Sequence, residues 1–274
     1  MPSNALSSEL RSVGPVRLEV LTGGTGRPIL FLHPGIGFRG GHAFLDRLAA
    51  SGQVFAPAHP GFEGSQGHAS IASVDDISYL YLDLLAQLGE PALVVGASLG
   101  GWIALEMAVK STARIAGLVL IDSVGVRFET RDVPDFADIY ALSSEEIAAR
   151  TFHDPALARI DYPNTPAAEL EIIARNREAE VRFCWSPYLH SRRLRTRLHR
   201  VDVPTLLIWG EDDRLAPPDY GRRLAQALPR ATFETIAHAG HFPQIERPDA
   251  VAAAVGRFVT TLAPRAGAQK ELAQ

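Results

Sequence analysis

The stretch Ala92–Val109, ALVVGASLGGWIALEMAV, decides the fold. It begins as a short apolar run, passes through a glycine-rich turn and continues as a helix-forming segment. A tight turn from a strand into a helix needs small residues beside its central residue, because larger side chains would collide across the turn. Gly96 and Gly100 meet this need on either side of Ser98. We therefore predict a buried strand, a sharp turn that presents Ser98, and a helix.

Further apolar runs on both sides of this stretch have the length of strands. They are Val16–Leu21, Ile29–Leu32, Val54–Phe55, Leu118–Ile121, Thr205–Trp209 and Thr232–Ile236. Several are continuous rather than alternating, which is typical of strands buried on both faces of a parallel sheet. Helical patterns separate them, most clearly Val74–Leu88, which Ser73 caps and Gly89 ends. This alternation predicts an α/β fold with a mostly parallel sheet.

The alternation stops between Glu129 and Arg200, where the sequence favours helices and contains no good strand. Thr165–Pro166 has the pattern of a helix start, and we expect Leu170, Ile173 and Val181 to point inward from that helix. The sequence thus predicts a core formed by residues 1–128 and 201–264 and a helical cap formed by residues 129–200. Residues 265–274 have the small and polar composition of a frayed tail.

Composition narrows the class of protein. The chain has 274 residues, of which 46% are apolar and 21% are charged, with a net charge of −4. These values are those of an ordinary globular protein and argue against a disordered chain or a strongly basic nucleic-acid binder. Cys184 is the only cysteine, so an intrachain disulfide is excluded and a reducing, cytoplasmic location is expected. Glycines, a serine and Glu106 interrupt the most apolar stretch, which makes it a poor membrane span.

Ser98 is a candidate nucleophile, but a serine hydroxyl needs a base and an acid that orients the base. Acidic residues that include Asp212 and Asp213 follow the run Thr205–Trp209. His238 and His241 follow the last apolar run, so the order is serine, acid, histidine.

A second glycine-bearing segment, His33-Pro34-Gly35-Ile36-Gly37, follows the run Ile29–Leu32. Its glycines let backbone N–H groups approach a bound oxygen closely. We expect the N–H of Gly35 or Ile36 to donate to the oxyanion that forms when Ser98 attacks a carbonyl.

These motifs together resemble the α/β-hydrolase superfamily over about Val16–Leu262. The matching pieces are HPGIG (33–37), GASLGG (96–101), WGEDDRLAP (209–217) and AGHFPQIERP (239–248). The resemblance implies Ser98 as nucleophile, Asp213 as acid and His241, rather than His238, as base. It also implies the N–H of Leu99 as an oxyanion donor, an eight-stranded mostly parallel sheet with helices on both faces, and a helical cap. It calls for no cofactor and no metal.

The chain also departs from the family's pattern. His33-Pro34 stands where the family often has His-Gly, and His59 stands where it often has an aspartate. We interpret His59 as structural. Asp122 follows the run Leu118–Ile121, where some members place the acid, so it remains an alternative to Asp213. An arginine cluster at 192, 193, 195, 197 and 200 is interpreted as a solvated face rather than a binding site.

The sequence predicts a cofactor-free serine hydrolase that cleaves a small ester, thioester or lactone. One alternative is a C–C hydrolase of ring-cleavage products with the same triad. Those relatives usually carry Ser-Gly-Pro-Gly and a tryptophan after the histidine, where this chain has Pro-Gly-Ile-Gly and Phe242. A non-catalytic ligand-binding protein on the same fold is a second alternative. The expected partner is a small-molecule substrate, with neither nucleic acid nor membrane, and the sequence leaves a homo-oligomer open.

Overall fold

The computed structural model describes residues 6–130 and 133–262, and these residues form an eight-stranded sheet in the order β1-β2-β4-β3-β5-β6-β9-β10. The strands are β1 (Ser7–Val13), β2 (Val16–Gly23), β3 (Pro28–Leu32), β4 (Gln53–Pro57), β5 (Ala92–Ala97), β6 (Ile115–Ile121), β9 (Thr205–Gly210) and β10 (Ala231–Ile236). The six strands from β4 to β10 in this order are parallel, whereas β1 and β2 run antiparallel at one edge. The predicted α/β fold with a mostly parallel sheet is confirmed.

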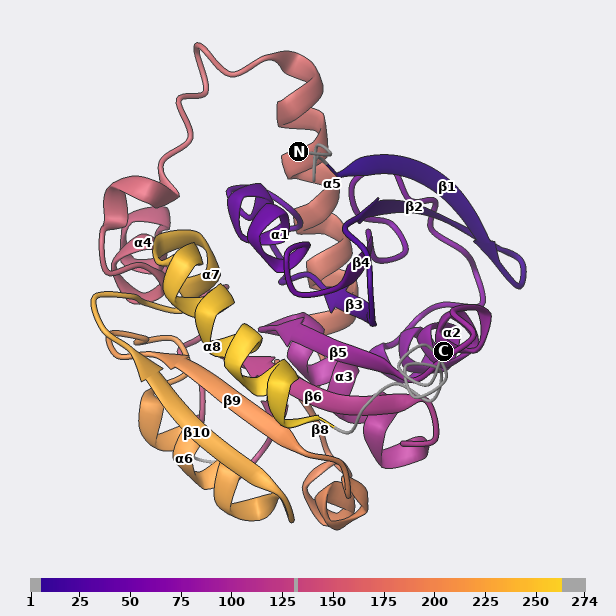
Figure 1. The fold of residues 1–274 in the computed structure, drawn as a ribbon. Coiled ribbons are helices and arrows are strands. Elements are labelled where there is room, and N and C mark those ends of the chain that lie inside the picture. The colour runs from indigo at the N-terminus through magenta and orange to yellow at the C-terminus, as the bar shows by residue number, and fades with distance from the viewer. Residues whose placement is uncertain (1–5, 131–132, 263–274) are drawn as a thin grey trace, which may run out of the picture.

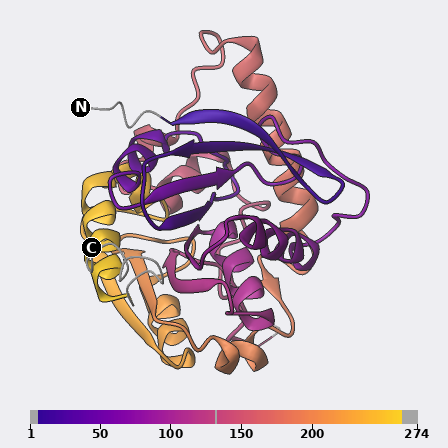
Figure 2. The same cartoon turned by 45° about the vertical axis from the view of Figure 1, so that its right-hand side comes forward.

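Helices cover both faces of the sheet (Figure 1). They are α1 (His42–Leu48), α2 (Val74–Gln87), α3 (Leu99–Lys110), α6 (Pro218–Ala227), α7 (Pro243–Glu246) and α8 (Pro248–Thr261). The turned view in Figure 2 places α8 and the α2–α3 pair on opposite sides of the sheet. Successive residues of one strand enter opposite cores, because Leu30 packs with α2 and α3 whereas Phe31 packs with α1 and α8. Burial on both faces explains the continuous apolar runs.

The edge strand β1 was not predicted from the sequence. Its residues, SSELRSV, are mostly exposed and polar, so it has no apolar run. It is held by hydrogen bonds to β2 over its whole length, from Ser7 opposite Thr22 to Val13 opposite Val16. Pairing with a neighbouring strand, rather than burial, fixes this segment.

Helical segments occupy the region between β6 and β9. They are α4 (Ser144–Thr151), the 3₁₀ helix η1 (Pro155–Ala158), α5 (Ala167–Cys184) and the 3₁₀ helix η2 (Arg195–Arg200). A two-stranded parallel pair, β7 (Gly125–Val126) with β8 (His190–Ser191), closes the base of this region, although no strand was expected there. Residues 265–274, for which a frayed tail was expected, lie outside the described residues.

The expected inward face of α5 is wrong. Val181 is 42% exposed and Leu170 and Ile173 are only half-buried, whereas the helix buries Asn176 and Ala179, with Phe183 and Cys184 further along. The first turns of α5 extend beyond the body of the molecule (Figure 1), so apolar residues there have no core to pack against. The later turns pack on the core, and Asn176 donates to the Glu63 carboxylate at 2.9 Å.

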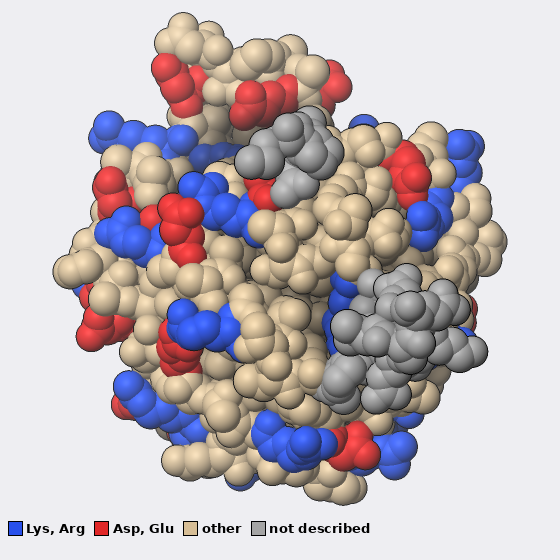
Figure 3. Space-filling model, viewed as in Figure 1, with Lys and Arg blue, Asp and Glu red and all other residues tan. Residues whose placement is uncertain are grey.

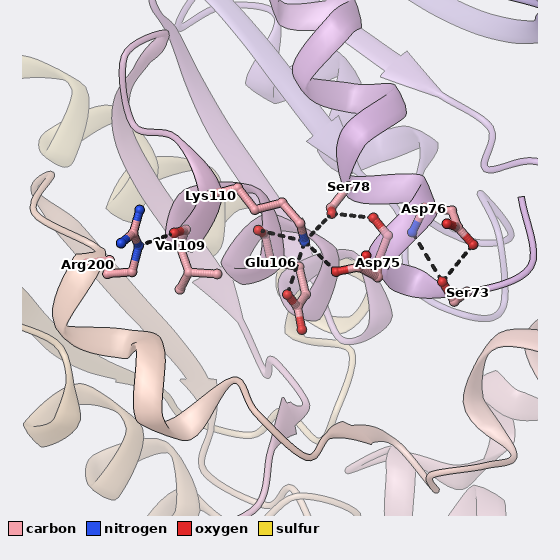
Figure 4. Close-up of polar contacts among 8 residues, drawn as sticks. All are labelled: Ser73, Asp75, Asp76, Ser78, Glu106, Val109, Lys110 and Arg200. Carbon is pink, nitrogen blue, oxygen red and sulfur yellow. Dashed lines mark hydrogen bonds and ion pairs between the residues drawn. The ribbon is translucent and has the colours of Figure 1, made fainter.

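A partly buried polar cluster ties α2 to α3, the helix that follows Ser98 (Figure 4). Lys110 Nζ lies 2.8 Å from the Asp75 carboxylate, 3.2 Å from the Glu106 carboxylate and 2.8 Å from Ser78 Oγ. Glu106 is only 2% exposed, so its negative charge depends on Lys110 for compensation. The ammonium group uses its hydrogen-bonding capacity within the cluster, which therefore acts as a structural fastening between the two helices.

Candidate active site

Ser98 lies on the sharp turn between β5 and α3. Its backbone has φ 49° and ψ −111°, a conformation that non-glycine residues rarely adopt. The turn is tight enough that a Cβ on Gly96 would lie 2.3 Å from the carbonyl oxygen of Gly100. A Cβ on Gly100 would lie 2.0 Å from the carbonyl oxygen of Leu32 in β3. Both glycines are therefore required by close backbone approach, as the sequence pattern indicated.

The structure brings Ser98, His241 and Asp213 into one hydrogen-bonded chain. His241 Nε2 lies 2.8 Å from Ser98 Oγ, and His241 Nδ1 lies 2.8 Å from Asp213 Oδ2. Because the carboxylate only accepts, Nδ1 carries the proton and Nε2 is left to accept from the serine hydroxyl. Residues far apart in sequence supply the three groups, at the carboxyl ends of parallel strands.

The acid and the base are each held from the other side as well. The second oxygen of Asp213 accepts from the N–H groups of Leu215 and Ala216 at 2.8 and 3.0 Å. The backbone N–H of His241 donates to the carbonyl of Thr151, the last residue of α4, at 2.8 Å. The side chains of Ser98, His241 and Asp213 are all buried, and Ser98 is the most exposed of the three at 8%. Such fixed, dry surroundings favour a pre-arranged proton transfer between Ser98 and His241.

The alternative residues lie elsewhere. The Asp212 carboxylate accepts from, or pairs with, His153 Nδ1 at 2.7 Å, at the surface. His238 is exposed, and its ring contacts that same His153. The structure therefore separates Asp212 and His238 from Ser98.

Asp122 lies next to the hydrogen-bonded residues Ser98, His241 and Asp213 but is not one of them. Its Oδ1 accepts from the Gly210 N–H at 2.9 Å, while Oδ2 is buried with no hydrogen-bond partner among the described residues. Burial raises the pKa of Asp122 well above its usual range, and the nearby charge of Asp213 adds to the rise. Within the described ranges, Asp122, Asp213 and His241 are the group whose metal-ligating atoms approach within 4.8 Å of one another, but the Asp213–His241 hydrogen bond already uses two of those atoms.

The segment at 33–37 lies beside the nucleophile turn, since β3 and β5 are neighbours and Leu32 touches Gly100. In the structure, Gly37 N–H donates to the Pro34 carbonyl, which turns the chain. The N–H groups of Gly35, Ile36 and Leu99 donate to no acceptor in the described part of the chain. Free N–H groups next to Ser98 are what an oxyanion requires.

His33 and His59 fasten that segment to the core. Their rings lie 3.7 Å apart, and both residues are fully buried. His33 Nδ1 donates to the Pro34 carbonyl, and His33 Nε2 accepts from the His59 backbone N–H. His59 Nε2 donates to the His33 carbonyl, and His59 Nδ1 accepts from Tyr81 Oη. Burial lowers the pKa of His33 to about 4 and that of His59 well below its usual value. Both rings are thus neutral and fully bonded, as expected of a structural His59.

Sequence reasoning missed Glu180, which borders this site, and Tyr140, which lies near Glu180. The Glu180 carboxyl lies against Gly35, because a Cβ on that glycine would be 1.9 Å from Glu180 Oε1. Burial raises the pKa of Glu180 to about 7, against the opposing effects of His241 and Arg177. Tyr140 Oη is buried without a hydrogen-bond partner among the described residues. No sequence signal could have identified either residue, since their positions depend on how α5 packs on the core.

The arginine cluster lies apart from Ser98. Arg195 lies over the Phe128 ring and donates to the Phe128 carbonyl, and Arg200 donates to the Val109 carbonyl (Figure 4). An open cavity of about 830 Å³ next to the cluster is lined by Arg127, Arg192 and Arg195 but also by Glu129 and Asp135. This mixture of charges favours a solvated face. On the face drawn in Figure 3, acidic and basic side chains are likewise interspersed.

Comparison with known proteins places the chain in a family. Residues 29–254 match the model of the alpha/beta hydrolase family. A pimeloyl-acyl-carrier-protein methyl ester esterase of Neisseria meningitidis is 30% identical over 232 residues, 80% of this chain and 72% of that protein. The 2-hydroxymuconate semialdehyde hydrolase of a Pseudomonas species is 29% identical over 276 residues, 94% of this chain and 96% of that protein.

Solved structures agree on the fold. A serine hydrolase from the bacterium Cycloclasticus zankles superposes with a TM-score of 0.76 at 21% identity, covering 93% of this chain and 98% of that one. The chain belongs to the α/β-hydrolase family. It is an enzyme of the hydrolase type, which confirms the predicted class. Among the helices of residues 6–130 and 133–262, none has the length and apolar character needed to cross a membrane.

Proposed function

We propose that this chain hydrolyses a small ester, thioester or lactone through an acyl-enzyme on Ser98, with His241 as general base and Asp213 as the acid that orients it. The observation that carries the proposal is the pair of 2.8 Å hydrogen bonds that joins the three side chains. Their burial supports it, because water does not compete for these bonds.

In the first half of the reaction, Ser98 Oγ attacks the substrate carbonyl carbon and its proton passes to His241 Nε2. Asp213 stabilises the imidazolium that forms. The negative charge that develops on the carbonyl oxygen is stabilised by the N–H of Leu99 and by that of Gly35 or Ile36, which have no other acceptor within the described residues. His241 then gives the proton to the leaving oxygen or sulfur, and the bond to that atom breaks.

In the second half, a water molecule takes the place of the leaving group. His241 Nε2 accepts a proton from this water as the water oxygen attacks the acyl carbon. The bond to Ser98 Oγ breaks, Oγ recovers the proton from His241, and the carboxylic acid leaves. Apart from the substrate and this water molecule, every group that takes part in the two halves of the reaction belongs to the protein.

We also propose residues 129–200 as a lid over this site. Two contacts support it, the Thr151 carbonyl that accepts from the His241 N–H and the Glu180 carboxyl that lies on Gly35. A lid of this kind limits the size of the acyl group and keeps water out. A series of p-nitrophenyl esters from acetate to palmitate should therefore show a maximum of kcat/KM at short or medium chains.

A fluorophosphonate probe tests the assignment of the nucleophile. The proposal predicts covalent labelling at Ser98, located by mass spectrometry of the labelled peptide, together with turnover of p-nitrophenyl butyrate. Ser123→Ala is a matched control, because Ser123 is a buried serine that packs against Gly101 of α3, the helix that follows Ser98, and donates to the Val124 carbonyl. Labelling in the control and its loss in Ser98→Ala are expected. Labelling of another residue would contradict the proposal.

Cleavage of a C–C bond with the same residues is a second candidate. The similarity to the Pseudomonas hydrolase favours it, since the match extends over 94% of this chain. 2-Hydroxymuconate semialdehyde, the compound named for that relative, and a p-nitrophenyl ester, compared under the same conditions, separate the two candidates. The higher kcat/KM identifies the bond that the enzyme cleaves.

A cytoplasmic location is a further part of the proposal. The single cysteine, Cys184, supports it, because its thiol is fully buried and the chain needs no oxidising compartment.

A further inference from the structure

Two polar groups of the region between β6 and β9 have no part in the proposed acyl transfer: Glu180, which borders the candidate site, and Tyr140, which lies near Glu180. Glu180 is on α5, and its carboxyl rests on Gly35, with Oε1, Cδ and Cγ at 1.9, 2.5 and 3.0 Å from the position of a Cβ on that glycine. Gly35 belongs to the segment that supplies free N–H groups beside Ser98. The carboxyl therefore borders the place where a substrate carbonyl would bind.

The surroundings of Glu180 leave its acceptor capacity unused. Among the described residues, no hydrogen bond reaches its carboxyl oxygens. Glu180 is half-buried. Near it, Tyr140 Oη, whose ring packs against Trp185 and Tyr188, is buried without a hydrogen-bond partner among the described residues. Native proteins rarely leave a buried polar group unpaired, so the Tyr140 hydroxyl points to a ligand that completes it.

The charged and titratable groups around Glu180 are few. Arg177 and Cys184 are on the same helix, His241 faces it from the core, and Tyr140 and Tyr188 lie on other segments of the proposed lid. Arg177 and His241 lower the pKa of Glu180, but burial outweighs them and raises it to about 7. Glu180 is thus neutral in mildly acidic solution and becomes negatively charged as the pH rises through neutrality.

We infer that Glu180 is a specificity-determining residue, which makes the enzyme prefer neutral substrates over substrates that carry a carboxylate near the scissile carbonyl. A carboxyl next to the oxyanion site repels a second negative charge, whereas it accepts from a hydroxyl or an amide. A substrate of the kind named for the Pseudomonas relative, a muconate semialdehyde, would bring such a carboxylate. The inference rests on the proposed function, because it assumes that carbonyl substrates react at Ser98.

The test compares charged and neutral esters over pH. One pair differs in the acyl group, mono-p-nitrophenyl glutarate against p-nitrophenyl valerate. A second pair differs in the leaving group, 4-carboxyphenyl butyrate against 4-acetylphenyl butyrate. The substrates' carboxylates stay ionised from pH 6 to 8. The ratio of kcat/KM within a pair cancels any pH dependence that the two substrates share, and rates with Ser98→Ala are subtracted as background.

We expect the preference for the neutral ester to rise by on the order of 10-fold between pH 6 and 8 in at least one pair. Glu180→Gln should keep a constant ratio over this range. Glu178→Gln is the matched control, because Glu178 is two residues earlier on the same helix, is exposed and pairs with Arg182. It should behave like the unaltered enzyme.

Flat ratios for both pairs in the unaltered enzyme would overturn the inference while leaving ester hydrolysis in place. The same rise in Glu180→Gln as in the unaltered enzyme would also overturn it. If neither neutral ester is hydrolysed at any pH, the proposed function fails, and this inference fails with it.

Discussion

His241 and the pair His33–His59 are buried to the same degree at the same edge of the sheet, yet their ring nitrogens have different kinds of partner. His241 joins a carboxylate on one side and a serine hydroxyl on the other. In the pair, the ring nitrogens bond to backbone groups and to Tyr81. Burial alone therefore does not distinguish a candidate base from a structural histidine.

The difference lies in what each ring can do with a proton. In the proposed reaction, His241 Nε2 accepts the proton of the Ser98 hydroxyl, and Asp213 stabilises the charge that results. A proton added to His33 or His59 would have to displace a hydrogen bond in a site with no carboxylate bonded to either ring. Burial then holds these two rings neutral. The predictions below separate the two roles, from the largest expected effect to the smallest.

Removing the reactive group should have the largest effect. Ser98→Ala and His241→Ala should each reduce ester turnover to near background, because the members of such a chain act as a unit and a residual acceleration of only about 10³–10⁴ over water remains without them. The measurement is kcat for p-nitrophenyl butyrate, with Ser123→Ala as control. The melting temperature of Ser98→Ala should remain close to that of the unaltered enzyme. More than about a tenth of the original kcat in Ser98→Ala would contradict the assignment.

The two neighbouring acids should respond very differently to the same change. Asp213→Asn removes the negative charge that orients His241, so kcat should fall by about 10³–10⁴-fold, less than in His241→Ala. Asp122→Asn should lower kcat by less than about 10-fold. Burial raises the pKa of Asp122 well above its usual range, which disfavours its charged form, and asparagine keeps an acceptor for the Gly210 N–H. If kcat falls more in Asp122→Asn than in Asp213→Asn, Asp122 rather than Asp213 is the acid that orients His241.

Substitutions in the pair His33–His59 should have the opposite effect to those at Ser98, His241 and Asp213: they should lower the stability of the fold and change kcat little. His59→Phe leaves Tyr81 Oη without its acceptor and the His33 carbonyl without its donor, which should cost about 2–4 kcal/mol of unfolding free energy. Tyr81→Phe removes one of these bonds and should cost less. Urea unfolding measures both, and kcat should change by only a few fold. Loss of kcat at unchanged stability would instead make His59 part of the reaction.

Local patterns in the sequence were enough to predict the elements that hold the candidate site. Gly96, Ser98 and Gly100 indicate the turn because backbone contact there excludes a Cβ. The predicted residues Asp213 and His241 also lie where the strand pattern placed them.

Features that depend on distant contacts could not be predicted in this way. Strand β1 has no apolar run because pairing holds it. The buried face of α5 and the place of Glu180 depend on where the helix leaves the core, which its own periodicity does not record. The bonds that make His59 structural include one to Tyr81, 22 residues away.

The smallest effect should appear in the pH dependence of stability. The pKa of His33 falls from its ordinary 6.5 to about 4 on folding, so between these values the unfolded chain binds more protons than the folded one. Unfolding free energy should therefore decrease as the pH falls from about 6.5 to 4, by at most about 3 kcal/mol from this residue, and His59 should act in the same direction. Urea unfolding at pH 7, 6 and 5 measures the decrease.

The contribution of His33 is isolated by comparison with His33→Gln, which is less stable at pH 7 but lacks this titration. The difference in stability between the two proteins should shrink as the pH falls. His199→Gln is the matched control, because His199 is exposed. If the difference in unfolding free energy between the unaltered enzyme and His33→Gln stays constant from pH 7 to 5, His33 accepts a proton in the folded state. His241 and the pair His33–His59 would then differ less than their hydrogen bonds indicate.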